Sequence, residues 1–236
     1  MIICSKNTVC ASVKAGRKIN IIYLEKSFDD YNVINIIKHS NVLIKRVDKN
    51  TLFDLCETKN HQGIAAEIQD YSYHSIDEIL KLDDARVIVL DELNDPHNLG
   101  SIIRSADAFS FPYIIIPENN SISLNATVAR VSTGSIENIK VIRVSSILKS
   151  LQLLKKNGYY IYGTSLNTKL NYSEVNYKKK FAIVFGSEGF GIRPLVLKEC
   201  DELVTISMSG TTNSLNVSNS AAIIMSWIDL KDRKKD

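Results

Sequence analysis

From Arg86 onward, runs of apolar and β-branched residues alternate with segments whose apolar residues recur at helical spacing. Such alternation is typical of a mainly parallel sheet covered by helices on both faces, because parallel strands need long crossover connections. The strands that we expect are Val87–Leu90, Tyr113–Ile116, Ile139–Val144, Tyr159–Gly163, Phe181–Phe185 and Leu203–Ile206. The expected helices are Leu99–Phe109, Asn125–Ser132, Ile147–Asn157, Pro194–Cys200 and Ser214–Leu230. The sequence therefore predicts an α/β fold.

The N-terminal part of the chain is typical of a second, smaller α/β unit. Its β-branched segments Ile19–Leu24, Asn41–Val47 and Gly63–Ile68 predict strands, and residues 29–39 and 49–57 predict helices. A polar and aromatic stretch that carries a short helical signal follows. We therefore expect a small domain over residues 1–70, a linker over 71–84 and a larger domain over 85–236.

Composition excludes few classes of protein. The net charge of +3 is compatible with nucleic-acid binding but too small to indicate it alone. No apolar run reaches the roughly 20 residues that span a bilayer, and the N-terminus lacks the pattern of a secretory signal, so we expect a cytoplasmic protein without membrane association. The four cysteines form no C-x-x-C pair and the four histidines are scattered, so we expect no metal site.

Three segments that follow expected strands carry the functional argument, because ligands of such sheets bind beyond the carboxyl ends of the strands. The first is DELNDPHNLGSIIRSADAF, residues 91–109. Asp95-Pro96 is a turn signal, Asn98 is a plausible N-cap, and Arg104 is expected to point toward the strand ends. A capped helix with a solvated arginine is the alternative interpretation.

The second segment is FAIVFGSEGFGI, residues 181–192. An apolar strand ends in a turn with three glycines and one acid, Glu188, and glycine there allows a ligand to approach the backbone closely. The spacing is G-x-x-G-x-G and not the dinucleotide-binding G-x-G-x-x-G, so a dinucleotide-dependent oxidoreductase is only a weak alternative. A tight turn with an exposed glutamate is the simpler one.

The third segment is SGTTNSLNVSNSAAIIMSW, residues 209–227. Small polar residues fill its first half, and Val217, Ala221, Ile224 and Ile228 then recur at the spacing of an amphipathic helix. Asn213 or Ser214 is a candidate cap for that helix. A single cap does not explain so many small polar residues, which suit a tightly packed irregular loop with satisfied backbone groups.

Together these segments resemble the motifs of the SpoU (TrmH-like) family of RNA 2′-O-ribose methyltransferases, which use S-adenosylmethionine. NLGSIIRSA matches the first motif, GSEGFG the second and ISMSGTTNSLNVS the third. LNATVARVSTGSIENIKVIRV resembles the stretch after the first motif. NHQGIAAEI resembles the end of the small RNA-binding domain in the subgroup that methylates a guanosine of 23S ribosomal RNA.

The resemblance implies a C-terminal domain threaded as a deep trefoil knot, with the small polar residues at the crowded knot crossing, and a homodimer formed through that domain. It implies that Asn98, Arg104, Glu188 and Asn216 line the catalytic site. The residues implied to bind the cofactor S-adenosylmethionine are Thr164, Gly186, Ile206, Met208 and Leu215. No metal is implied. Arg104 is the family's usual candidate for activating the 2′-OH, but a guanidinium stays protonated and is better suited to clamping negative charge.

The sequence leaves three points open. Transfer RNA is the alternative substrate to ribosomal RNA, because the motifs around the cofactor do not select the target. A non-catalytic RNA-binding protein of the same fold is another alternative, although Arg104, Glu188 and Asn216 are all present. The third motif has Ser207 where the family usually has proline; this change restores an N–H group and is expected to affect loop rigidity more than chemistry.

Overall fold

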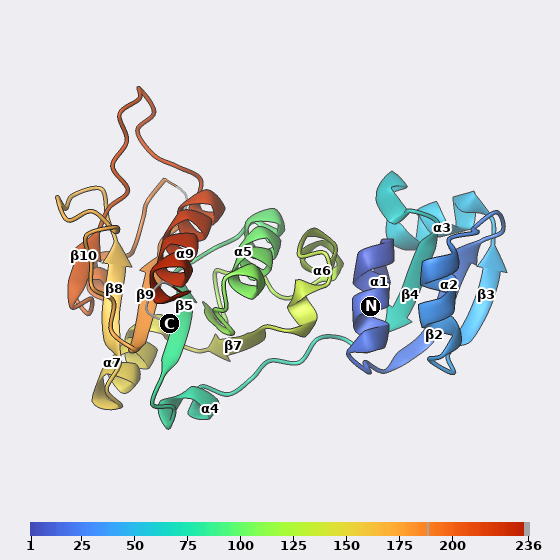
Figure 1. Ribbon diagram of the computed structural model, residues 1–236, viewed down its shortest axis with the longest axis horizontal. Coiled ribbons are helices and arrows are strands. Elements are labelled where there is room, and N and C mark those ends of the chain that lie inside the picture. The colour runs from blue at the N-terminus through green and yellow to red at the C-terminus, as the bar shows by residue number, and fades with distance from the viewer. Residues whose placement is uncertain (188, 234–236) are drawn as a thin grey trace. The chain divides into compact units, whose positions relative to one another are not determined.

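The computed structural model describes residues 1–187 and 189–233, which form two compact units. The first unit contains Met1–Ser72 together with Leu124–Glu137, and the second contains Tyr73–Ser123 together with the chain from Asn138 onward. Figure 1 shows the secondary structure of both units. The helices of the described residues include none long and apolar enough to cross a membrane.

The second unit is built on a six-stranded parallel sheet with the strand order β10-β8-β9-β5-β6-β7. Its strands are β5 (Ala85–Leu90), β6 (Tyr113–Pro117), β7 (Lys140–Val144), β8 (Tyr160–Thr164), β9 (Lys180–Phe185) and β10 (Glu202–Val204). Its helices are α4 (Asp77–Leu80), α5 (Pro96–Ala108), α7 (Ile147–Lys156), α8 (Pro194–Leu197) and α9 (Val217–Arg233). The predicted α/β fold with a parallel sheet is confirmed. The trefoil knot stays a prediction.

Side chains alternate between the two faces of this sheet along each strand. Because both faces carry apolar residues, helices cover both. Val87 and Val89 of β5 belong to a core that includes Leu151 and Leu154 of α7. Ile88, between them, points to the opposite face and is fully buried. Helices α5 and α9 pack against each other and lie side by side in Figure 1.

The first unit contains a mixed four-stranded sheet with the order β1-β4-β2-β3, in which only β2 and β3 are parallel. Its strands are β1 (Ile2–Cys4), β2 (Ile19–Glu25), β3 (Leu43–Val47) and β4 (Ile64–Ile68). Its helices are α1 (Lys6–Lys14), α2 (Tyr31–Lys38), α3 (Lys49–Cys56), α6 (Ala126–Val131) and the 3-10 helices η1 (Lys59–His61) and η2 (Ser135–Glu137).

Strand β1 and helix α1 are absent from the sequence prediction. The strand has only three residues, which is too short to show a period. The buried face of α1 includes the polar side chains of Thr8 and Ser12, so its apolar periodicity is weak. The Thr8 hydroxyl bonds the Ser5 hydroxyl at 2.9 Å, which makes this burial possible.

Residues Leu124–Glu137, which lie between β6 and β7 in the chain, belong to the first unit by their contacts. The sequence assigns this segment to the larger domain. Its helix α6 packs against β1, and Arg130 donates from Nη1 to the Thr58 hydroxyl at 2.9 Å. The sequence does not reveal that the chain returns to the first unit here, because the segment has the same helical pattern as a crossover helix.

The Glu137 carboxylate is the polar centre of this return. Its side chain is 4% exposed and it forms an ion pair with Arg17 at 2.9 Å. It also accepts hydrogen bonds from the hydroxyls of Ser12 at 2.6 Å and Tyr71 at 3.2 Å. The Arg17 guanidinium lies over the Tyr71 ring, 4.1 Å from its centroid. A buried carboxylate with this many donors is satisfied, so it ties the two parts of the unit together.

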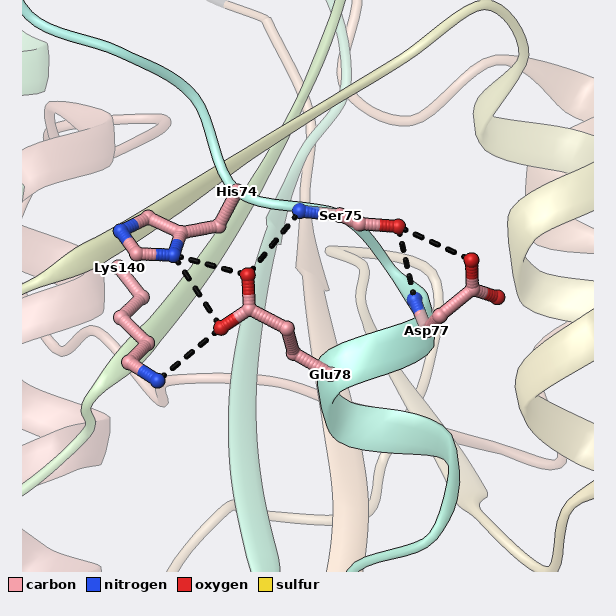
Figure 2. Close-up of polar contacts among 5 residues, drawn as sticks. All are labelled: His74, Ser75, Asp77, Glu78 and Lys140. Carbon is pink, nitrogen blue, oxygen red and sulfur yellow. Dashed lines mark hydrogen bonds and ion pairs between the residues drawn. The ribbon is translucent and has the colours of Figure 1, made fainter.

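The segment that leads into β5 is ordered by a small polar cluster, shown in Figure 2. His74 donates its backbone N–H to the Val141 carbonyl at 2.9 Å and so continues the sheet beside β7. The Glu78 carboxylate contacts His74 Nδ1 at 2.9 Å and Lys140 Nζ at 3.0 Å. The Ser75 hydroxyl accepts the Asp77 N–H at 3.2 Å, just before α4, and so restrains the entry to that helix.

We predict that Gly163→Ala destabilises the second unit. A Cβ atom there would lie 2.6 Å from Cys200 Sγ and 2.9 Å from Leu203 Cδ2. Overpacking of this kind costs about 1–3 kcal/mol in the free energy of unfolding. Urea denaturation measures it, and adding Cys200→Ala is expected to recover part of the loss. Gly210→Ala is the control, because a Cβ there meets nothing within 4 Å. An equal loss in both single variants would contradict this packing argument.

We predict that Glu78 contributes stability that depends on pH. The hydrogen bond from Lys140, followed by that from His74, lowers the pKa of Glu78 from 4.5 to about 2. A lowered pKa stabilises the folded state above the unfolded value, and this stabilisation disappears as the pH falls toward 2. Glu78→Gln is therefore expected to lower the thermal unfolding midpoint at pH 6, with a difference that vanishes near pH 2. Glu118→Gln, an exposed control without an ion pair among the described residues, is expected to show no such trend.

Candidate functional site

A cavity of about 630 Å³ lies where β8, β9 and β10 end. The loops after these three strands and the first turn of α9 form its walls. Figure 1 shows the loop between β10 and α9 extending beyond the arrowhead of β8. The lining residues include Thr164, Gly186, Ile206, Met208, Leu215 and Asn216. The structure therefore brings together in one cavity the residues that the sequence suggests for cofactor binding.

The described residues of the cavity wall carry no charge. They are small polar, glycine and apolar residues. Three apolar side chains at the cavity remain exposed: Phe190 at 95%, Leu166 at 62% and Leu215 at 37%. Such walls offer backbone amides, carbonyls and hydroxyls for hydrogen bonds and flat apolar surface for a ring.

The glycine-rich loop after β9 folds back on itself. Ser187 and Gly191 exchange both backbone hydrogen bonds, at 3.1 and 3.0 Å. Gly189 and Gly191 have φ values of +85° and +69°, in the region that favours glycine. A Cβ atom on Gly186 would lie 1.9 Å from the Gly191 carbonyl carbon. These glycines are thus required by the shape of the loop.

The predicted catalytic residues Asn98 and Asn216 are in direct contact. Asn216 donates from Nδ2 to Asn98 Oδ1 at 3.0 Å, and Asn98 is buried in the first turn of α5. The Asn216 Oδ1 atom accepts the backbone N–H of Ser218 at 2.8 Å. Asn216 therefore caps α9 and connects that helix to α5.

Two expected caps are wrong. Helix α5 begins at Pro96, and Asp95 accepts the His97 N–H at 2.9 Å, so Asp95 and not Asn98 is its N-cap. Proline suits the first helical position because its φ is already helical and its missing N–H has no helical partner. Helix α9 begins after Asn216, three residues beyond the first candidate cap, Asn213.

The other two predicted catalytic residues are placed differently. Arg104 is exposed on α5, is not part of the cavity wall, and makes no ion pair with any described residue. Glu188 lies outside the described residues. Arg104 thus faces solvent, outside the described cavity wall.

The run of small polar residues before α9 is exposed. The sequence favours a tightly packed, buried loop here, but residues 209–216 are all exposed in the structure. The expectation that these side chains are buried is therefore wrong, and their place at a knot crossing stays a prediction. The physical reason is that nothing else in the described chain covers this loop. Small polar groups that face water need no internal partners.

Ser207, which replaces the usual proline, is held by a side chain. Asn171 donates from Nδ2 to the Ser207 hydroxyl at 2.7 Å. Backbone hydrogen bonds also join Thr205 to Leu170 and Tyr172, both at 2.9 Å. These contacts restrain the loop in the absence of a proline ring. Sequence reasoning missed Asn171, because it is far from the motif in the chain.

The sequence fits known families over both units. Residues 85–226 match the SpoU rRNA Methylase family. The chain belongs to this family. Residues 2–74 match the substrate-binding domain of RNA 2′-O ribose methyltransferases. Accordingly, the chain is an RNA methyltransferase of the SpoU/TrmH family, with a substrate-binding domain followed by a methyltransferase domain.

Relatives agree with this assignment. A putative TrmH family tRNA/rRNA methyltransferase of Staphylococcus aureus (strain COL) is 38% identical over 95% of this chain and 93% of its own length. The SpoU methyltransferase AviRb from Streptomyces viridochromogenes, solved with AdoMet, matches 100% of this chain and 91% of its own with a TM-score of 0.84 and 19% identity. An AdoMet-bound rRNA methyltransferase from Sinorhizobium meliloti matches 98% of this chain and 87% of its own length, with a TM-score of 0.82 and 21% identity. At these identities the two solved structures support the fold.

The loop after β8 contributes more to the cavity than the sequence suggests. Ser165, Leu166 and Asn167 all line it, whereas sequence reasoning selects only Thr164. The run of small polar residues after this strand resembles the run after β10 and is the signal that identifies the loop. Within the described residues, no cluster of three or more His, Cys, Asp or Glu side chains is arranged to hold a metal ion.

We predict that Asn216→Ala destabilises the second unit by about 1–2 kcal/mol, because α9 loses its cap and its link to Asn98. Urea denaturation measures the loss. Asn216→Asp keeps an acceptor for the Ser218 N–H but loses the donor to Asn98, so an intermediate loss is expected. Asn219→Ala, an exposed position in the first turn of α9, is the control and is expected to change stability by less than about 0.5 kcal/mol. An Asn216→Ala variant as stable as the wild type would contradict the capping role.

Proposed function

We propose that this protein methylates a ribose 2′-OH in RNA with S-adenosylmethionine as the methyl donor. The observation that carries the proposal is the cavity at the strand ends, whose described lining residues are uncharged. Its walls contain the matching residues of the second and third motifs, and Asn216 connects it to the head of α5. The match of residues 2–74 to a 2′-O ribose methyltransferase domain supports the 2′-OH as acceptor.

The cavity fits the proposed cofactor by its chemistry. Thr164, Gly186, Ile206 and Met208 offer backbone groups and short side chains, and Leu215 offers an apolar surface for the adenine ring. A volume of about 630 Å³ lies within the range of small-molecule sites. When bound, S-adenosylmethionine supplies the methyl group that is transferred.

Arg104 acts on the substrate side in this proposal. The 2′-OH must lose a proton and must be held in line with the donor. Since a guanidinium remains protonated, Arg104 binds the neighbouring phosphate and stabilises the developing alkoxide, while that phosphate accepts the 2′-OH proton. Its exposure and lack of an ion pair with the described residues fit this role. Asn98 and Asn216 connect α5 and α9 beside the site. Glu188 is assigned to orienting Arg104 or the ribose.

The favoured substrate is a guanosine of 23S ribosomal RNA, on the resemblance of the small N-terminal domain. Transfer RNA is the second candidate, since the S. aureus relative is named for both RNAs. We also propose a cytoplasmic homodimer formed through the methyltransferase domain. The exposed apolar side chains of Leu166 and Phe190, and the uncovered loop over residues 209–216, support a second copy as their cover.

The test is transfer of labelled methyl from S-adenosylmethionine to unmodified ribosomal and transfer RNA, followed by alkaline hydrolysis. A 2′-O-methyl group blocks cleavage, so a labelled, alkali-resistant dinucleotide from ribosomal RNA is expected. Label in transfer RNA alone would keep the chemistry and overturn the substrate. Bound cofactor without label in either RNA would favour a non-catalytic RNA-binding protein.

We predict that Arg104→Ala lowers methyl transfer by about 100-fold or more, the scale of losing an electrostatic stabiliser of the transition state. The affinity for S-adenosylmethionine is expected to stay within about twofold, because Arg104 is not part of the cavity wall. Single-turnover kinetics and calorimetry measure the two effects. Arg104→Lys keeps the charge but not the planar fork, so partial activity is expected. Arg143→Ala removes another exposed arginine and is the control. Wild-type turnover in Arg104→Ala would exclude the clamp.

A further inference from the structure

An ion pair between a buried carboxylate and a partly exposed arginine lies at the end of the glycine-rich loop. The Asp91 side chain is fully buried, and its carboxylate contacts the Arg193 guanidinium at 2.6 Å through Nη2 and at 3.0 Å through Nε. The backbone N–H of Arg193 also donates to Asp91 Oδ2 at 3.0 Å. Among the described residues, Arg193 supplies all the hydrogen bonds to this carboxylate. The hydrogen bond to the Asp91 carboxylate, and then the negative charge of that group, raise the pKa of Arg193, so the arginine stays charged.

Asp91 contacts the residues on both sides of the loop. Its backbone N–H donates to the carbonyl of Phe185, the last residue of β9, at 2.8 Å. Its side chain holds Arg193, the first residue after Ile192. The entry and the exit of the loop over residues 186–192 are therefore fixed by a single residue at the end of the neighbouring strand β5.

Arg193 also restrains Glu92, the residue after Asp91. Its Nη1 contacts Glu92 Oε1 at 2.9 Å, and Glu92 has a φ of +62°, a conformation that non-glycine residues adopt rarely. The guanidinium thus holds the exit of the glycine loop and the turn after β5 with one planar group. A lysine cannot reproduce this arrangement, because it lacks the fork of donors.

The loop cannot shift at its exit without breaking this pair. Leaving the Asp91 carboxylate buried and unpaired is strongly unfavourable, so the pair forces the loop into one position. The cavity depends on that position, because the described residues from Phe185 to Ile192 all line it.

We propose that Asp91 and Arg193 are positioning residues that hold the glycine-rich loop in the conformation that binds the adenosyl cofactor. This inference rests on the proposed function. Neither residue contacts the reacting atoms in it; both act through the loop. Substitution of Arg193 therefore lowers the fraction of molecules whose cavity can bind the cofactor. The apparent dissociation constant for S-adenosylmethionine rises by the inverse of that fraction.

The experiment is calorimetric titration of the full chain with S-adenosylmethionine, well below the unfolding midpoint of each variant. If Arg193→Gln leaves about a tenth of the molecules competent, the dissociation constant rises about tenfold. Arg193→Lys is expected to lie between Arg193→Gln and the wild type. Asp91→Asn combined with Arg193→Gln is expected to bind more tightly than Arg193→Gln alone, because no unpaired charge remains buried.

Arg86→Gln is the matched control. Arg86 forms an ion pair with Asp232 at 3.0 Å at the opposite end of the same strand, β5. This variant is expected to lose stability and to keep the wild-type cofactor affinity. Hydrogen exchange provides an independent readout: the amides of Ser187 and Gly191, which protect each other, are expected to exchange faster in Arg193→Gln and unchanged in Arg86→Gln.

The outcomes separate the two proposals. Unchanged cofactor affinity in Arg193→Gln, or an equal loss in Arg86→Gln, would overturn the positioning role and leave the proposed function intact. A raised KM for RNA with unchanged cofactor affinity would also overturn it and would make Arg193 an RNA contact. No binding of S-adenosylmethionine by the wild-type chain would overturn the proposed function and this inference with it.

Discussion

The common direction of the six strands in the second unit is the constraint on which its site depends. Since all of them are parallel, β8, β9 and β10 end at one edge of the sheet, and the loops that follow them form one cavity. The strand order also places β9 directly beside β5, with Leu90 opposite Phe185. As a result, Asp91 reaches the glycine-rich loop although about a hundred residues separate them in the chain. An antiparallel arrangement would divide these groups between the two ends of the sheet.

Polar side chains connect the segments that form this site. Asn98 and Asn216 connect helices α5 and α9, Asn171 holds Ser207, and Arg193 holds Asp91. Each of these contacts joins segments that are distant in sequence and uses a directional hydrogen bond, which defines position more narrowly than apolar burial does. The cavity itself is neutral among its described residues. Its described residues therefore offer shape and backbone groups for recognition.

The first unit is made from two separate parts of the chain, and the buried Glu137 carboxylate explains how the second part is held. Arg17, Ser12 and Tyr71 all direct donors at it, so the segment after β6 must return to α1 to satisfy the charge. The polypeptide consequently passes between the units three times, after Ser72, Ser123 and Glu137. This organisation links the substrate-binding domain to the methyltransferase domain by more than the segment before β5.

The sequence by itself determined the α/β class, nearly all the strands, and the motifs that identify the family, because these depend on local periodicity and on residues that are close together in the chain. Only the tertiary structure decided which side chains meet. It showed Asn216 as the cap of α9 and partner of Asn98, Arg193 as partner of Asp91, and Leu124–Glu137 as part of the first unit. It also showed that the small polar residues over 209–216, which the sequence suggested were buried, are exposed to solvent. These features arise from strand order and long-range hydrogen bonds, and neither leaves a period in a single sequence.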